Sequence, residues 1–396
     1  MRGSPTPTWD TRTLGMRLLF ALAMLGAVFA LRWVNPPLPD FQVWAAADAL
    51  AGGGANPYDT DALNAELASD AQYGPWWQDE PERFRVRFFN PPMWLAILWL
   101  VQFSPFVMSF AGLLMIAGSL VALSRPADNK TFAGYVLVTA VLLLSPLADA
   151  TFSFGQVGLF LAGLVGVRLV LMDRVAEGVP LALLSFKPHI ALAAFIPSLM
   201  SKSSTALQRL IPPAVALLVL TVLLYGVDLF RWWVEAFVED DGSIIPIDDL
   251  TLRTLSQRWP LPIEWSVFTL VAAFIIIVGI ARRFRDADRL TLTLFSIALT
   301  VFLSGHAFAH DWLWMMFVPV VKRWDLTRSV VGALAVVVVD SLTRGTVTPP
   351  FAIVSSPSVA ALAIVVYLGV DICRSSRGEH SATEAVDEPA EQPGFV

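Results

Sequence analysis

Apolar stretches about as long as a lipid bilayer is thick recur along the whole chain and restrict what it can fold into. A run of roughly 17 to 25 mostly apolar residues can cross a hydrocarbon core of about 30 Å as a helix, because a helix satisfies its own backbone hydrogen bonds there. Of the 396 residues, 56% are hydrophobic and 15% are charged, which lies far outside the balance of soluble proteins. The sequence therefore predicts an all-α polytopic membrane protein.

Ten stretches are predicted to cross the membrane, and the first is interpreted as an uncleaved anchor. It follows Arg2, Arg12 and Arg17 as a signal peptide would, but its outer end lacks a small-residue cleavage pattern. A further apolar segment, Pro91 to Phe103, is too short to cross alone and is expected at the outer interface or as a half-helix. The predicted crossings are residues 14–34, 105–124, 131–148, 157–172, 210–226, 265–281, 289–304, 309–321, 327–341 and 351–372.

The segment from Val179 to Met200 is long enough for one more crossing but is broken at Lys187-Pro188. If it enters the membrane and returns, 18 Lys and Arg residues lie on the cytoplasmic side and 8 outside, with Lys187 within the membrane. A full crossing would invert every later loop and place the arginines between residues 282 and 289 outside. Because cytoplasmic loops carry the excess of basic residues, we predict a re-entrant hairpin.

Composition also divides the chain and indicates its compartment. With the hairpin, residues 35–90 and 227–264 become two long outer loops. Residues 1–373 are expected to form one transmembrane domain, and residues 374–396, which are acidic and poor in apolar side chains, a disordered cytoplasmic tail. The single cysteine, Cys373, excludes a disulfide framework and a cysteine metal site. Of the 27 basic residues 23 are arginine, a bias typical of a high-GC bacterial genome, so a bacterial plasma membrane is expected.

Asp40 stands at the outer end of the first span and opens a stretch, residues 40–50, that is predicted to be a short helix lying at the membrane surface. Aspartate is a preferred N-cap residue, and capping alone accounts for it. Alternatively, a carboxylate at the rim of a membrane cavity is a candidate general base. Asp59, in the sequence Asn56-Pro57-Tyr58-Asp59, is a turn residue by the same reasoning and otherwise a candidate substrate contact.

Lys187 is predicted to lie near the middle of the membrane, since it follows the start of the hairpin by about eight residues at 1.5 Å each. An ammonium group there costs at least about 2.5 kcal/mol unless it has a partner or a water-filled cavity. We therefore interpret Lys187 as an anion-binding residue. The alternative is that its long side chain snorkels to the interface and that Pro188 merely breaks the helix.

His306 and His310 are four residues apart and would share one face of a helix. Together with Asp311 they suggest a metal site, but no third spaced histidine ligand and no zinc-protease glutamate accompanies them, so no metal is predicted. We expect them to donate hydrogen bonds to a substrate, with helix capping as the alternative.

Arg253 and Arg258 lie in the second outer loop. Arginine side chains suit phosphate, and a loop above a membrane cavity is where a lipid phosphate would sit, so both are candidate substrate contacts. Solvated surface arginines are the alternative.

The order of these features along residues 35–325 resembles glycosyltransferase family 87, which is related to the polyprenyl-phosphate-mannose-dependent α-mannosyltransferases of the GT-C fold. The matching residues are Asp40-Phe41 with Ala45 to Gly53, Asn56-Pro57-Tyr58-Asp59, Asn90-Pro91-Pro92, Gly155-Gln156, Lys187-Pro188, and Ser304 to Asp311 before Pro319.

This resemblance implies a GT-C bundle of about ten crossings plus a re-entrant hairpin, with Asp40 as general base and Gln156 among the substrate contacts. The donor would be a polyprenyl-phosphate sugar, most simply mannose, and the acceptor a lipid or glycan on the outer face, as in cell envelope biosynthesis. No cofactor, nucleotide site or nucleic-acid partner is expected, whereas membrane lipids surround the chain.

Two other classes of protein remain open from the residues alone. A transporter or flippase of lipid-linked sugars would bind with the same charged groups and release without breaking a bond, and a non-catalytic scaffold needs none of them. The long outer loop that carries Asp40 favours the enzyme, because transporters place their key charges at the midplane.

Overall fold

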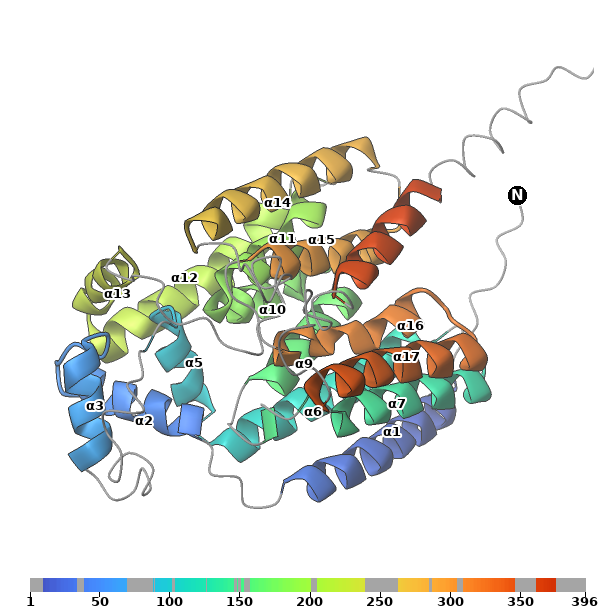
Figure 1. Cartoon of the computed structure of the whole chain (residues 1–396), viewed down its shortest axis with the longest axis horizontal. Helices are drawn as coiled ribbons and strands as arrows, with labels where there is room; N and C mark the ends of the chain where they lie inside the picture. The colour runs from blue at the N-terminus through green and yellow to red at the C-terminus, as the bar shows by residue number, and fades with distance from the viewer. Residues whose placement is uncertain are drawn as a thin grey trace, which may run out of the picture.

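The computed structural model describes residues 10–33, 39–69, 88, 90–101, 104–125, 127–145, 148, 151–152, 157–200, 205–238, 263–284, 287–304, 309–345 and 361–374. Helices make up these ranges, which contain no strand, and Figure 1 shows them packed into one bundle. Those that lie in predicted crossings are α1 (Thr11–Arg32), α6 (Pro105–Leu123), α7 (Asn129–Leu144), α9 (Gly158–Val170), α12 (Ala206–Tyr225), α14 (Ile263–Arg283), α15 (Arg289–Leu303) and α17 (Leu326–Gly345).

These eight helices coincide with eight of the predicted crossings, which confirms the all-α polytopic fold. By length and composition α1, α6 and α12 could each cross a membrane, and α7, α9 and α15 are shorter apolar helices. Residues 309–321 are helical but are not one α-helix, because a 3-10 helix, η6 (Ala309–Phe317), precedes the short α16 (Val318–Val321). The last predicted span overlaps the helix of residues 361–374, and the segment after Pro91 forms the short α5 (Met93–Leu100).

Polar side chains fix where several of these helices begin. Asp128 accepts a hydrogen bond from the Thr131 backbone N–H at 2.7 Å, and Ser104 accepts one from Val107 at 3.2 Å. Such caps satisfy backbone donors that the first turn of a helix leaves free. Asp288 does the same for α15 through the backbone N–H of Thr291. Short polar turns between apolar runs therefore set the helix boundaries.

Glycines let α6 and α9 pack closely. A Cβ atom on Gly112 would lie 2.5 Å from the backbone of Leu159, and one on Gly163 would lie 2.8 Å from the carbonyl oxygen of Gly112. Small residues at such crossings are typical of membrane helices, where close backbone packing replaces the hydrophobic effect.

The segment from Val179 to Met200 doubles back, as the charge distribution predicted. It consists of α10 (Gly178–Leu183), the 3-10 turn η4 (Leu184–Phe186) and α11 (Pro188–Leu199). The Arg168 guanidinium contacts residues at both ends of the segment, which a straight helix of this length would separate by roughly 30 Å. Gly178 opens the hairpin, and a Cβ atom there would clash with the carbonyl oxygen of Arg209.

The predicted helix after Asp40 is present as α2 (Pro39–Gly52), but two of its expected features differ. Because α2 begins at Pro39, Asp40 is the second residue of its first turn and not the N-cap; proline is well suited to that first position. The helix also does not simply lie on a surface. Phe41, Val43 and Ala46 are buried on different sides of the helix, so that protein surrounds most of it.

The described helices of the two long loops lie at one end of the bundle. Figure 1 shows α2 and α3 (Thr60–Ser69) near α13 (Asp228–Val238), which follows the end of α12. The hydrogen bond from the Tyr225 hydroxyl to Asp48, 2.6 Å long, joins α12 to α2 at this end. Both loops therefore start on the same side, as the predicted topology requires.

Candidate functional site

Lys187 forms a buried ion pair with Asp311, at the break between η4 and α11. Its Nζ atom lies 3.0 Å from each carboxylate oxygen of Asp311, which η6 contributes. The Asp311 side chain is fully buried, whereas Lys187 remains 15% exposed. A carboxylate at this distance offsets part of the cost of holding a charged group away from water. The pair satisfies the requirement for a partner that the position of Lys187 in the sequence implied.

A row of buried aromatic rings connects this ion pair to the helix that carries Asp40. Trp94 of α5 lies at its centre, with ring centroids 5.1 Å from Trp44 and 4.6 Å from Phe186. Phe186 immediately precedes Lys187, and Trp44 packs at 5.5 Å against Phe41, the neighbour of Asp40. Aromatic contacts of this kind are directional and rigid. They fix the start of α2 relative to the tip of the hairpin.

The two Asn-Pro motifs of the sequence also meet in this region. The Tyr58 hydroxyl donates a 2.9 Å hydrogen bond to the carbonyl oxygen of Asn90, and its ring packs 5.1 Å from that of Phe88. The side-chain oxygen of Asn56 accepts from the Tyr58 backbone N–H and closes the turn. The turn between α2 and α3 is thus attached to the residues that precede α5.

Asp59 caps the helix that follows this turn. Its Oδ1 atom accepts hydrogen bonds from the backbone N–H groups of Asp61 at 2.9 Å and Ala62 at 3.2 Å. This is the local role that the sequence offered as the alternative to substrate binding. A contact between Asp59 and a substrate stays a prediction.

Asp48, on the side of α2 that faces α12, was not singled out from the sequence. Burial raises the pKa of its carboxyl above the ordinary value, and the hydrogen bond from Tyr225 opposes part of that rise. The pattern of residues 40–50 alone gives no sign of this contact, because Tyr225 lies 177 residues later. The hydrogen bond anchors α2, and with it Asp40, to the bundle.

Replacing Asp48 with asparagine should flatten the pH dependence of stability. The native carboxyl has a higher pKa than the unfolded one, so its favourable contribution is complete below the unfolded value of 3.8 and is lost as pH rises through the native value. Asparagine keeps an acceptor for Tyr225 and does not ionise. In thermal unfolding measured from pH 4 to pH 8, the melting temperature of the variant should therefore rise relative to that of the wild type as pH increases.

Tyr225→Phe is the matched control for this prediction. It leaves the carboxylate in place without its donor, so the loss of stability with rising pH should become steeper. If the difference in melting temperature between the wild type and Asp48→Asn is the same at every pH, the raised pKa of the Asp48 carboxyl would be contradicted.

The structure describes only part of the remaining candidate site residues. The backbones of Asp40 and His310 are placed, in α2 and η6, and their side chains lie outside the described part. His310 directly precedes Asp311, so η6 brings its backbone to the ion pair. Four candidates lie outside the described residues altogether: Gln156, Arg253, Arg258 and His306. Among the described side chains no group of three His, Cys, Asp or Glu residues could hold a metal ion.

Comparison with known proteins identifies the family. The model of glycosyltransferase family 87 matches residues 88–308, which is more than half of the chain. These residues include the hairpin with Lys187 and the aromatic link through Trp94. No curated protein and no solved structure shows significant similarity to the chain. The chain belongs to glycosyltransferase family 87 and is a membrane glycosyltransferase with a sugar donor and an acceptor as its substrates.

Proposed function

We propose that this enzyme transfers a sugar, most simply mannose, from a polyprenyl-phosphate donor to a lipid or glycan acceptor on the outer face of a bacterial plasma membrane, as a step of cell envelope biosynthesis. The observation that carries the proposal is the aromatic row from Phe41 to Phe186. Its three ring contacts link the helix of the candidate base to Phe186, which precedes the largely buried Lys187. A lipid-linked anionic donor requires this combination of apolar surroundings, a cation and a carboxylate. The GT-C fold belongs to the same proposal.

The reaction needs one base and no external reagent. Asp40 accepts the proton of the acceptor hydroxyl as that oxygen attacks the anomeric carbon of the sugar. The bond from that carbon to the phosphate oxygen breaks, its electron pair leaves with the phosphate, and the configuration at the carbon inverts. The products are the glycosylated acceptor and polyprenyl phosphate.

The leaving phosphate needs charge stabilisation more than a proton. Lys187 contributes, but Asp311 already balances its charge, so the pair as a whole is neutral. We therefore assign most of the positive charge at the phosphate to Arg253 and Arg258. His306 and His310 would position sugar or phosphate oxygens, and Gln156 and Asp59 are further substrate contacts.

Direct assay of the purified protein tests this function. Incubation in detergent with radiolabelled polyprenyl-phosphate mannose and a membrane lipid extract should yield a new product whose mass exceeds that of its acceptor by one hexose. Nuclear magnetic resonance of the product should show the anomeric configuration opposite to that of the donor.

The same protein in liposomes separates an enzyme from a flippase. Movement of the donor across the bilayer without any glycosylated product would overturn the proposal. The family match favours the enzyme over that rival.

The predicted topology gives a separate expected outcome. With Cys373 replaced by serine, single cysteines at positions 70 and 243 should react with a membrane-impermeant thiol reagent added outside intact cells. A cysteine at position 286 should react only after the cells are opened. The physical basis is the excess of basic residues on the cytoplasmic side, and labelling of position 286 from outside would reverse the assignment of the outer face.

A further inference from the structure

We propose that Arg168 is a positioning residue for the donor site. Its guanidinium holds together the two arms of the hairpin whose tip carries Lys187. The inference rests on the proposed role of Lys187 in binding the donor phosphate. Arg168 does not contact Lys187 or Asp311 in any interaction that the structure shows, so its effect would be transmitted through the hairpin.

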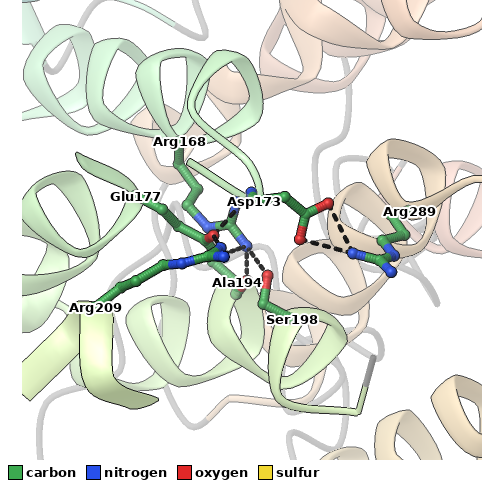
Figure 2. Close-up of polar contacts among 7 residues, drawn as sticks. All are labelled: Arg168, Asp173, Glu177, Ala194, Ser198, Arg209 and Arg289. Carbon is green, nitrogen blue, oxygen red and sulfur yellow. Dashed lines mark hydrogen bonds and ion pairs between the residues drawn. The ribbon is translucent and has the colours of Figure 1, made fainter. Parts of the chain in front are cut away.

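The first arm is held by an ion pair at its base. The Nη2 atom of Arg168 lies 3.0 Å from Oε1 of Glu177, the residue just before α10, and both side chains are almost completely buried. Figure 2 shows the Arg168 side chain pointing from α9 to Glu177. The other carboxylate oxygen of Glu177 is 3.0 Å from Arg209 of α12 and accepts the backbone N–H of Asp173 at 2.8 Å.

The second arm is held by the same nitrogen. Nη2 of Arg168 donates to Ser198 Oγ at 2.6 Å and to the carbonyl oxygen of Ala194 at 3.2 Å, both in the second half of α11 (Figure 2). Residues that lie on opposite sides of the hairpin tip in sequence thus meet at one buried cation. Arg168 closes the base of the hairpin.

At the tip the two arms are joined by short-range backbone hydrogen bonds, from the Lys187 N–H to Leu184 and from the Ile190 N–H to Lys187. The hairpin changes from α10 to the 3-10 turn η4, breaks at Lys187, and restarts as α11 with Pro188, which cannot donate a hydrogen bond. A change in the spacing of the two arms at the base therefore tilts the tip and moves the Lys187 ammonium group relative to Asp311 and a bound phosphate. Displacements of about 1 Å at such groups are sufficient to affect function.

Stability alone does not explain a buried arginine at position 168. Its Nε and Nη1 atoms are buried and make no hydrogen bond within the part of the chain that the structure describes. Apolar side chains of similar volume often replace buried ion pairs without loss of stability. A guanidinium, in contrast, can contact a carboxylate, a hydroxyl and a carbonyl oxygen at the same time. Arg168 can therefore hold the two arms of the hairpin together.

The functional test uses Arg168→Met and, as a milder change, Ser198→Ala, which removes one contact to the second arm. Arg289→Gln is the matched control, because Arg289 belongs to the same network through its ion pair with Asp173, at 2.7 Å, and this ion pair does not involve Glu177, Ala194 or Ser198. We expect Arg168→Met to raise the KM for the polyprenyl-phosphate donor about tenfold with a much smaller change in kcat. Ser198→Ala should give a smaller change in the same direction and Arg289→Gln none.

A double-mutant comparison separates positioning from a general loss of structure. In a background that already lacks the Lys187–Asp311 pair, Lys187→Met with Asp311→Asn, adding Arg168→Met should leave the donor KM unchanged, whereas any effects on Tm should still add. An equal increase in KM in both backgrounds, or no increase in either, would show that Arg168 does not act through Lys187.

The spacing of the arms can be measured without any assay of transfer. Spin labels at positions 179 and 199, which are solvent- or lipid-exposed, report the width of the hairpin base in a Cys373→Ser protein. The distance distribution should be narrow in the wild type and in Arg289→Gln, and broader or longer in Arg168→Met. An unchanged distance distribution in Arg168→Met would show that Arg168 does not hold the two arms together. Altered spacing with an unchanged donor KM would overturn only the positioning role, and absence of transfer by the unmodified enzyme would instead refute the proposed function.

Discussion

Asp40→Asn is expected to reduce turnover by about 10² to 10⁴-fold, the usual contribution of a positioned general base, while the protein still folds and binds its lipid donor. Asparagine has nearly the same volume as aspartate but cannot accept a proton at neutral pH. Since Asp40 is the second residue of α2, the substitution removes one acidic group from a first turn. That electrostatic change is worth only about 0.3 to 1 kcal/mol. The measurements are kcat with the radiolabelled donor and the melting temperature in detergent.

Asp61→Asn provides a control that is matched in position. Asp61 is also the second residue of its helix, α3, and is exposed, so the same substitution there tests the helix effect without the proposed chemistry. Turnover should remain at the wild-type level. Near-normal turnover by a well-folded Asp40→Asn protein would refute the assignment and direct attention to Asp59 or His306 as the base.

Lys187→Met is expected to destabilise the protein by about 3 to 5 kcal/mol, because it removes the ammonium group that lies 3.0 Å from the fully buried Asp311 carboxylate. The reverse change, Asp311→Asn, should cost less, since the Lys187 ammonium is partly exposed and can be solvated. The double variant Lys187→Met with Asp311→Asn removes both charges and should recover most of the lost stability. It should not recover donor affinity if Lys187 binds the phosphate. Thermal unfolding and donor KM separate the two effects.

Lys322→Met is the comparison for this ion pair. Lys322 pairs with Asp371 near the other end of the bundle, but 28% of the Asp371 side chain is exposed, so the remaining carboxylate stays hydrated and the expected loss is smaller. Equal stability of Lys187→Met and the wild type would show that Asp311 does not depend on Lys187. Unchanged donor affinity in the double variant would return Lys187 to a purely structural role.

Features that are local in the chain could be predicted from the sequence. The lengths of the apolar runs predicted the positions of α1, α6 and α12, because the thickness of a bilayer sets how many residues a spanning helix needs. The basic residues predicted that Val179 to Met200 turns back, because charge asymmetry records which side each loop occupies. The depth of Lys187 predicted that it needs a partner or a water-filled cavity. Each of these inferences uses only near neighbours or total charge.

The identity of the partners was decided by tertiary structure. Asp311 follows Lys187 by 124 residues, and Arg168 reaches Ser198 across 30 residues of chain. Hydrophobic periodicity does not predict such pairs. A helix inside a bundle of apolar helices is apolar on most of its faces, so its sequence does not show which neighbouring helix each face contacts. This is also why α2 was expected on a surface and is instead enclosed around Trp44. The sequence by itself determined that helices cross a membrane and that a buried lysine among them needs a partner or a water-filled cavity. Only the packing of those helices against one another determined which carboxylate neutralises it, because contacts between helices depend on side-chain shapes that meet in three dimensions and not on spacing along one chain.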